Sequence, residues 1–222
     1  MQLDDAALDV ARGSLERTEL FVLGEFHGIA ETASAILTLV RRLGVRVLGL
    51  EWSFNEVGAV LDELMRTGRF DLDAIWSIPA VGDLFAGDGR FTAELVRVLE
   101  HQIQSGELTA VVPIDRLDEE PPLVVDREID MAERLLAHRR PGDPMLVVPG
   151  YFHASRTPFD GFEPMFVHLE RALPGLANGA LEFGEGASYS RGEQSVRPLD
   201  RPFDAVYRLE RATPATVPAR RA

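Results

Sequence analysis

The sequence contains no cysteine in 222 residues. That absence excludes disulfide bonds, cysteine zinc sites and a cysteine nucleophile, so histidine and carboxylate groups would have to hold any metal ion. Histidine is itself scarce, with 5 residues in the chain. The position of each histidine therefore carries much of the information about function.

Basic side chains are outnumbered. The chain has 23 Lys and Arg against 36 Asp and Glu, a formal net charge of −13, which repels nucleic acid and anionic membrane surfaces. No apolar run is long enough to span a membrane, and residues 1–5 lack the basic start and apolar core of a signal peptide. We therefore expect a cytoplasmic protein whose partner is a small-molecule or peptide substrate.

Four short apolar runs predict buried strands. They cover residues 20–23, 45–50, 110–114 and 145–148, and such runs are typical of strands buried on both faces of a parallel sheet. Helical periodicity between the first two runs makes residues 20–51 a βαβ unit.

The predicted fold is α/β, with a central, mainly parallel sheet flanked by helices. A helical insertion occupies residues 53–108, in which positions 91–104 show a clear apolar stripe. Residues 180–183 and 204–210 alternate as strands and are expected at the sheet edge in antiparallel orientation. We expect a single domain over residues 1–211, followed by a Pro- and Ala-rich tail, 212–222, that is disordered.

Two short histidine motifs each follow one of these strands. Gly24-Glu25-Phe26-His27 comes after the first strand, and Gly150-Tyr151-Phe152-His153 comes after the fourth. Ligands of open parallel sheets bind beyond the carboxyl ends of the strands, so the two motifs could converge on one substrate. A single histidine at such a place equally well stabilises its own loop. Two copies in the same context favour a shared site.

Acidic residues end the other two strands, Glu51 the second and Asp115 the third. A carboxylate beside an imidazole fixes its tautomer and suits it to act as a general base, and the same groups can also ligate a metal. We therefore predict that the catalytic residues are Glu25, His27, Glu51 and His153 and that they share one pocket. Asp115 ranks below them because Asp at such a junction commonly caps a turn.

Aromatic residues near these motifs are candidates for substrate contact. Trp52 adjoins Glu51, and Tyr151 lies inside the second motif. Trp76 begins a glycine-rich loop, residues 76–89, that we expect to border the pocket as a lid. The remaining histidines, His101, His138 and His168, are expected to lie outside the site.

In order and spacing, the motifs resemble a superfamily that groups erythromycin esterases, ChaN-type haem-uptake proteins, TraB proteins and TIKI metalloproteases. The matching residues are Gly24, Glu25 and His27 after the first strand, Glu51 after the second, and Gly150 and His153 after a later one. Residues 126–132 are similar to the arginine-containing helix of the esterases, and residues 113–115 are similar to their Gly-x-Asp strand end. The resemblance, which spans roughly residues 18–156, adds Arg127 to Asp115 as a substrate-binding candidate.

The branches of this superfamily imply different chemistry. The esterase-like branch implies that His27 activates water without a metal, that Glu25 and Glu51 orient groups, and that His153 stabilises or protonates. The TIKI-like branch implies a peptidase with a divalent metal bound through His27, His153 and Glu51. The ChaN-like branch implies haem binding, and it ranks third because the chain lacks an export signal and a haem-specific motif. The chain is also shorter than a typical erythromycin esterase, which leaves less insertion to wall a macrolide pocket.

The leading hypothesis is hydrolysis of an ester or amide bond in a small molecule or peptide by acid–base chemistry of the predicted catalytic residues. The same groups could instead abstract a proton next to a carbonyl, in a cofactor-independent epimerase or cyclase of natural-product biosynthesis. A third hypothesis is a module that binds haem or a metal.

Overall fold

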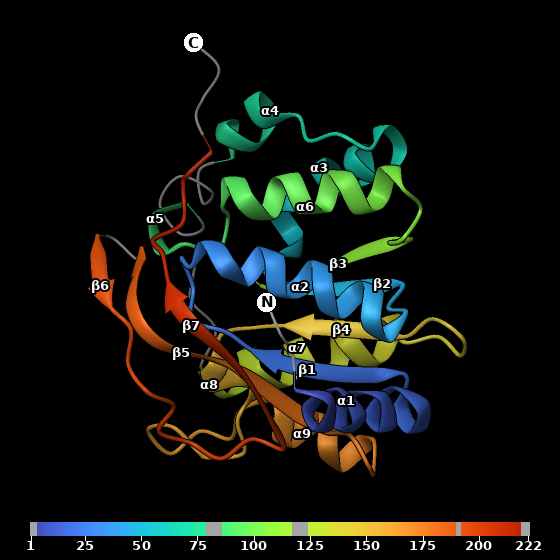
Figure 1. The fold of residues 1–222 in the computed structure, drawn as a ribbon. Helices are drawn as coiled ribbons and strands as arrows, with labels where there is room; N and C mark the ends of the chain where they lie inside the picture. The colour runs from blue at the N-terminus through green and yellow to red at the C-terminus, as the bar shows by residue number, and fades with distance from the viewer. Residues whose placement is uncertain (1–3, 79–85, 117–123, 190–191, 219–222) are drawn as a thin grey trace.

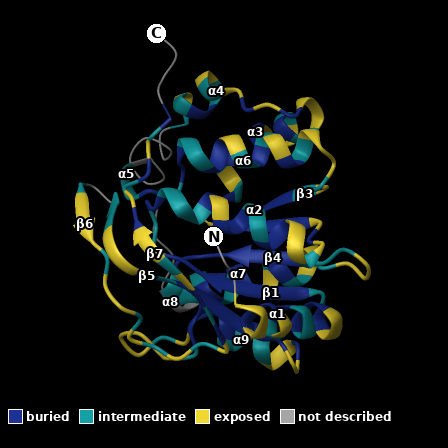
Figure 2. Cartoon of the chain, viewed as in Figure 1, coloured by how far each residue is buried: buried dark blue, intermediate teal, exposed yellow. Residues whose placement is uncertain are grey.

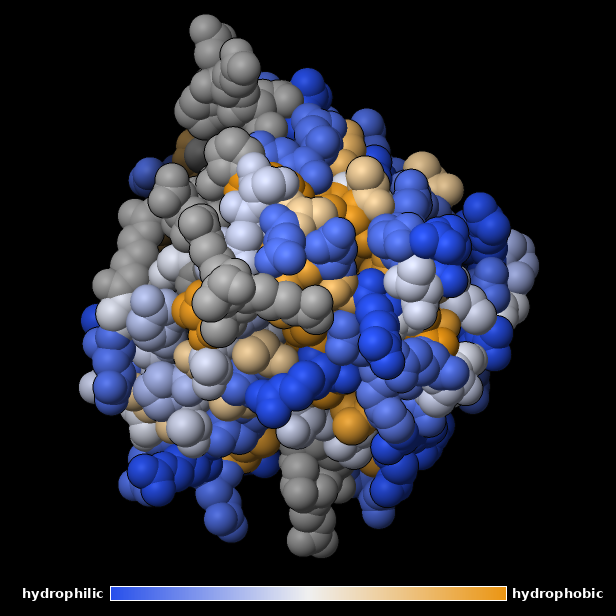
Figure 3. Space-filling view, turned by 90° about the horizontal axis from the view of Figure 1, so that it is seen from above, coloured by the Kyte–Doolittle hydropathy of each residue, from blue (hydrophilic) through white to orange (hydrophobic). Residues whose placement is uncertain are grey.

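The computed structural model describes residues 4–78, 86–116, 124–189 and 192–218. A seven-stranded sheet forms its centre, in the order β3-β2-β4-β1-β5-β6, with β7 also paired to β5 (Figure 1). No helix in the described ranges combines the length and the apolar character needed to cross a membrane. On the face seen in Figure 3, hydrophilic side chains separate smaller areas of apolar ones.

The four predicted strands are present and run parallel to one another. They are β1 (Leu20–Gly24), β2 (Val47–Ser53), β3 (Ala110–Asp115) and β4 (Met145–Val148). Consecutive residues of β1 alternate between two core clusters: Leu20 and Val22 belong to one, and Phe21 and Leu23 belong to the other. The sheet is therefore buried on both faces, which explains why its strands are apolar throughout.

Helices cover both faces of the sheet. In chain order they are α1 (Asp5–Thr18), α2 (Ala30–Leu43), α3 (Phe54–Thr67), α4 (Leu72–Ser77), α5 (Ala86–Asp88), α6 (Ala93–Gln104), α7 (Val124–His138), α8 (Tyr151–Ala154) and α9 (Met165–Ala172). Apolar residues of α1, α2, α3 and α6 pack in one core cluster, whereas those of α7 and α9 pack in the other. The predicted helical insertion between β2 and β3 is confirmed, and it holds α3 to α6.

The last strands complete one edge of the sheet. They are β5 (Asn178–Tyr189), β6 (Glu193–Ser195) and β7 (Ala205–Ala212), and the predicted antiparallel edge is formed by β5 and β6. Figure 2 shows β6 exposed, in contrast to the buried central strands. The strand expected at 204–210 differs in direction, because β7 runs parallel to β5. Asn178 and Asp204 exchange two side-chain-to-backbone hydrogen bonds of 3.1 Å, which places the start of β7 beside the start of β5.

Residues 213–218 pack against the rest of the chain instead of forming the disordered tail expected for 212–222. The backbone N–H of Ala30 donates to the carbonyl of Thr213, and that of Ala215 donates to the carbonyl of Gly28, at 2.9 and 2.8 Å. Further on, the N–H of Ala93 donates to the carbonyl of Thr216 at 2.7 Å. These partners, a loop residue and the first residues of α2 and α6, lie far away in the sequence, so the local composition of the tail does not reveal them. Residues 219–222 lie outside the described part of the chain.

Candidate active site

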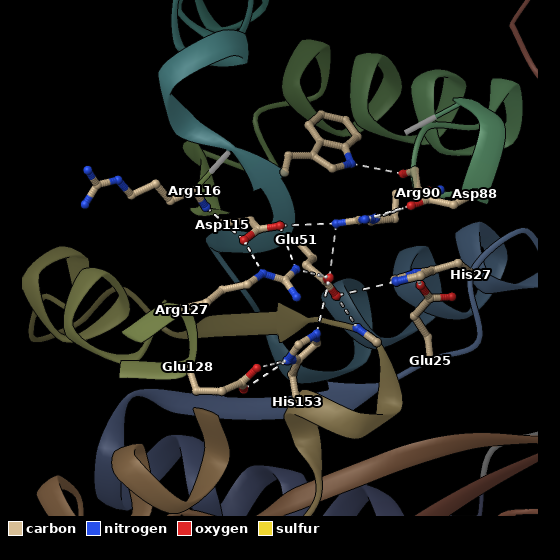
Figure 4. A network of polar contacts seen from close by, with 12 residues as sticks. Glu25, His27, Glu51, Asp88, Arg90, Asp115, Arg116, Arg127, Glu128 and His153 are labelled. Carbon is tan, nitrogen blue, oxygen red and sulfur yellow. Dashed lines mark hydrogen bonds and ion pairs between the residues drawn. The ribbon is translucent and has the colours of Figure 1, made fainter. Parts of the chain in front are cut away.

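Glu51 lies at the centre of a buried network of charged side chains at the carboxyl edge of the sheet (Figure 4). Its Oε1 accepts hydrogen bonds from Arg127 Nη2 at 2.8 Å and from Arg90 Nη1 at 3.1 Å. Its Oε2 accepts from the backbone N–H of Gly150 at 2.7 Å. With three donors on its two oxygens and 4% of the residue exposed, Glu51 is held in one position.

Two histidines from distant parts of the chain flank this carboxylate. His27 Nε2 lies 3.5 Å from Oε2, and His153 Nε2 lies 3.4 Å from Oε1. On its other nitrogen, His27 Nδ1 pairs closely with Glu25, and His153 Nδ1 lies 2.7 Å from Glu128. Each imidazole therefore sits between its own carboxylate and the shared one. The structure thus brings the four residues predicted as catalytic into one contact network.

A second layer of charges surrounds Glu51. The fully buried Asp115 accepts hydrogen bonds from Arg127 Nε and Nη2 at 2.8 and 2.7 Å and from Arg90 Nη1 at 3.2 Å. Arg90 Nη2 also pairs with Asp88 at 2.7 Å. The two guanidinium groups therefore lie between Glu51 and Asp115. Asp115, predicted from its strand end, and Arg127, predicted from the resemblance, both belong to the network.

Sequence reasoning missed three members of the network, Asp88, Arg90 and Glu128. Asp88 lies in the loop predicted as a lid, and Arg90 directly follows that loop. A single charged residue in an irregular segment has no periodicity or motif that would mark it as part of a site. Glu128 follows Arg127 on α7, and the one-residue spacing lets the two side chains reach different partners. A buried imidazole needs a partner for each of its nitrogens. The acidic residues of the helix predicted at 123–137 were therefore candidates for the carboxylate that pairs with His153, and Glu128 is one of them.

The network determines the protonation of its members. Burial alone would raise the pKa of Glu51, but the positive charges of His153, Arg90 and His27 hold its pKa well below the usual range. Burial alone would lower the pKa of His27, but the charges of Glu25 and Glu51 raise that pKa to about 10. For His153, Glu51 and the hydrogen bond to Glu128 outweigh burial and raise the pKa to about 9. Both imidazoles are therefore cationic at neutral pH.

Two glycines let the His27 loop touch the Arg90 loop. Gly28 has φ 78°, and a Cβ there would lie 1.8 Å from the carbonyl oxygen of Tyr189. Gly89 has φ 86°, and its Cβ would lie 2.3 Å from the Cα of Gly28. The N–H of Gly28 donates to the carbonyl of Gly89 at 3.1 Å. Only residues without a side chain permit this approach, so the positions of His27 and Arg90 depend on it.

The three aromatic candidates occupy different places. Trp52 is buried in the core, packs edge-on against Phe70 and Phe91, and donates from Nε1 to the carbonyl of Arg90 at 2.9 Å. Trp52 therefore supports Arg90 from behind. Tyr151 stacks between Phe26 and Phe152, with centroids 4.5 and 4.3 Å away. Trp76, on α4, packs at the margin of the core and does not line either of the two cavities beside the histidines.

Cavities adjoin both histidines. A small one, of about 30 Å³, is bordered by His27, Glu25, Glu51 and Arg90, and it has room for about one water molecule. A larger cleft, of about 230 Å³, is bordered by His153 and Arg127 together with aromatic side chains. Gly89, in the loop predicted as a lid, lines the small cavity, but residues 79–85 of that loop lie outside the described ranges. Of these two cavities, the cleft is the one with room for a small organic molecule.

A divalent metal does not fit this donor set. In the described ranges, no group of three or more histidine and carboxylate side chains is arranged to hold a metal ion. Glu51 already bonds two guanidinium groups, and their positive charge opposes a cation there. His27 and His153 each bond a carboxylate through Nδ1, so only Nε2, at 3.5 and 3.4 Å from Glu51, would be left for a metal or a haem iron.

Comparisons with known proteins agree on the fold. No family model matches the sequence, and no curated protein is significantly similar to it. A solved structure of a Bacillus cereus protein matches with a TM-score of 0.70 and 12% identity, covering 96% of this chain and 92% of that one. A succinoglycan biosynthesis protein matches with a TM-score of 0.69 and 11% identity, covering 97% and 100%. At this level of identity the two matches show that the fold is shared, and they carry no information about activity.

The matches also include the haem-binding ChaN of Campylobacter jejuni, at 13% identity, with 82% of this chain and 86% of that one covered. The α/β fold predicted from the sequence is shared by the two matches with TM-scores of 0.70 and 0.69. The TM-score of the ChaN match is 0.47, and we take nothing about haem from it.

The raised pKa values predict that stability falls as pH rises. A group whose pKa is higher in the folded state stabilises that state below the unfolded pKa, here about 6.5, and loses the effect as pH rises through the folded pKa. We expect the free energy of unfolding to decrease between pH 7 and pH 10, as measured by urea denaturation. His27→Gln should make this decrease shallower. A free energy that is constant over this range in the wild type would contradict the assignment.

Proposed function

We propose that this protein is a hydrolase of an ester or amide bond in a small molecule, working by acid–base chemistry without a metal. One observation carries the proposal: two imidazoles contact opposite oxygens of a single buried carboxylate, Glu51, and each has a second carboxylate of its own. Paired proton-transfer groups with separated pKa values are what hydrolysis needs.

The contacts of Glu51 suggest which histidine is the base. His153 faces Oε1, whose negative charge is shared with Arg90 and Arg127, whereas His27 faces Oε2, where the other donor is a neutral N–H. His153 therefore has the weaker hold on its proton. We assign His153 as base and His27 as acid, the reverse of the roles that the superfamily resemblance implies.

Arg127 is placed to stabilise the charge that develops on the substrate. Its side chain borders the same cleft as His153 and is 25% exposed, although it is anchored by Asp115 and Glu51. A fixed cation beside the reacting carbonyl stabilises the oxyanion of the tetrahedral intermediate. In this mechanism the base takes a proton from water and the water oxygen bonds to the carbonyl carbon. The leaving group, which must reach from the cleft toward the small cavity beside His27, departs with a proton from the acid.

The hydrolase proposal is tested by turnover of chromogenic nitrophenyl esters and nitroanilides. We expect release of nitrophenol or nitroaniline by the wild type after dialysis against a chelator, and loss of it in His153→Gln. His101→Gln is the matched control, because His101 contacts Arg41 on the surface, away from the network. Release that disappears with the chelator and returns with a divalent ion would contradict the metal-free mechanism. Release that is unchanged in His153→Gln would contradict the site.

The pH dependence of turnover gives a further prediction. The active state needs one histidine neutral and the other protonated, so kcat/KM should rise through about pH 9, pass a maximum, and fall through about pH 10. A pH–rate profile of the wild type measures both limbs. If His153 is the base, the limb on the acidic side should disappear from the residual activity of His153→Gln and persist in His27→Gln. A maximum near pH 6 would rule out this pair.

A further inference from the structure

The cleft beside His153 has the size of a single ring. Its volume of about 230 Å³ exceeds that of an engineered cavity of about 150 Å³ that binds benzene, and it is smaller than the pockets of roughly 300–1,000 Å³ that take drug-sized ligands. Phe152, Phe159 and Phe162 supply its apolar lining. A six-membered ring with one small substituent is the occupant that this space and lining suit.

The aromatic lining is held in place by a tight turn. Phe159 and Phe162 exchange two backbone hydrogen bonds of 3.0 and 2.9 Å across Asp160 and Gly161, which have φ angles of 48° and 85°. Positive φ at both central residues is typical of a rigid type I′ hairpin turn. Phe159 is 53% exposed, a rare state for a large apolar residue in this structure. The turn therefore presents Phe159 to solvent in a fixed position.

Other side chains support this aromatic surface. The ring of Phe152 lies 4.7 Å from that of Phe159, centroid to centroid. The guanidinium carbon of Arg201 lies 4.3 Å from the centroid of Phe152 and 5.7 Å from that of Phe159, within the range of cation–π attraction. These contacts restrain the rings in the absence of a ligand, which lowers the entropic cost of binding a flat molecule.

The polar end of the cleft offers donors rather than acceptors. Arg127 uses Nε and Nη2 for Asp115 and Glu51, and its contacts with described residues leave Nη1 without an acceptor. The carboxylates at the cleft are already engaged: Glu128 accepts from His153 and from the N–H of Met165, and Glu163 pairs with Arg171. The group that completes this end is an anionic or carbonyl oxygen.

We propose that the cleft binds aryl carboxylates of benzoate size, with the ring against Phe152 and Phe159 and the carboxylate toward Nη1 of Arg127. The inference rests on the proposed function where it assigns a role to this ligand: the aromatic acid is the product of ester or amide hydrolysis. The substrates are then esters or amides of aromatic carboxylic acids, R–CO–X with an aromatic R, which water converts to R–COOH and H–X.

Binding of benzoate tests the inference without turnover. Calorimetric titration of the wild-type protein with benzoate should give saturable binding, whereas acetate and benzylamine at the same concentrations should not, because one lacks the ring and the other carries the wrong charge. Phe159→Ala should weaken benzoate binding about three- to tenfold, the range expected for one aromatic contact. Phe203→Ala is the control, since Phe203 packs partly buried against a core cluster and does not line the cleft. Phe159→Leu, which keeps an apolar side chain on the turn, should fall between the wild type and Phe159→Ala.

Three results would overturn the inference: no saturable binding of benzoate, equal binding of acetate or benzylamine, or unchanged affinity in Phe159→Ala. Its failure is distinguishable from failure of the proposed function. A protein that hydrolyses nitrophenyl acetate but does not bind benzoate is a hydrolase with another substrate class. A protein that binds benzoate and hydrolyses nothing keeps the ligand site and loses the hydrolase assignment.

Discussion

Replacement of Glu51 by Gln is expected to lower kcat/KM by about a hundred- to ten-thousand-fold, the usual effect of disabling acid–base machinery. The amide keeps the shape of the side chain but removes the negative charge that holds both imidazoles and raises their pKa values. The expected profile of the residual activity is therefore shifted toward lower pH. Steady-state kinetics over a pH series measures both effects.

Glu107→Gln is the matched control for this change. Glu107 is a half-buried carboxylate that pairs with Arg41 at 3.0 Å and takes no part in the network. The activity of the Glu107→Gln variant should therefore equal that of the wild type. Alanine at His27 or at Glu51 should likewise abolish turnover with the fold intact, and alanine at His168 should be close to neutral. Full activity of both Glu51→Gln and His27→Ala would leave the network with a binding or structural role.

Replacement of Arg127 by Met is expected to lower the free energy of unfolding by about 3–5 kcal/mol. The Arg127 guanidinium bonds Asp115 and Glu51, both nearly free of solvent. Its removal leaves Arg90 and the two histidines to compensate their negative charges among the described residues. Urea denaturation at pH 7 measures the loss.

The control for this prediction is Arg97→Met. Arg97 is 70% exposed and pairs with Glu94 at 3.4 Å, so its loss should change stability by about 0–1 kcal/mol. If the free energy of unfolding falls equally in the two variants, the ion pairs of Arg127 with Asp115 and Glu51 contribute no more to stability than an exposed pair does. Loss of activity in Arg127→Met with unchanged stability would assign this side chain to substrate rather than to the fold.

The parts of the site that sequence could predict are those that follow from strand ends. His27, Glu51, Asp115 and His153 each follow or end a short apolar run, and parallel strands bring such positions to one edge of a sheet. The parallel centre and the helices on both faces were predictable for the same reason, because strands buried on both faces are apolar at every position.

The parts that could not be predicted depend on contacts between distant segments. Arg90 comes from a loop with no periodicity, and its place is set by the contact of Gly28 with Gly89. The direction of β7 follows from the pairing of Asn178 with Asp204, which no local pattern reveals. Which oxygen of Glu51 meets which histidine, and hence the order of their pKa values, is likewise a property of the assembled structure.

The hydrogen bonds of residues 213–216 to Gly28, Ala30 and Ala93 link the site to the order of synthesis. His27 leaves the ribosome early, but the loop that carries it is fastened by a segment translated long afterwards, and that segment also holds the start of α6 next to Arg90. Contacts between residues so far apart in the chain form late in folding. A nascent chain can therefore contain every charged group of the network before the segment that fixes the loops of His27 and Arg90 has been made.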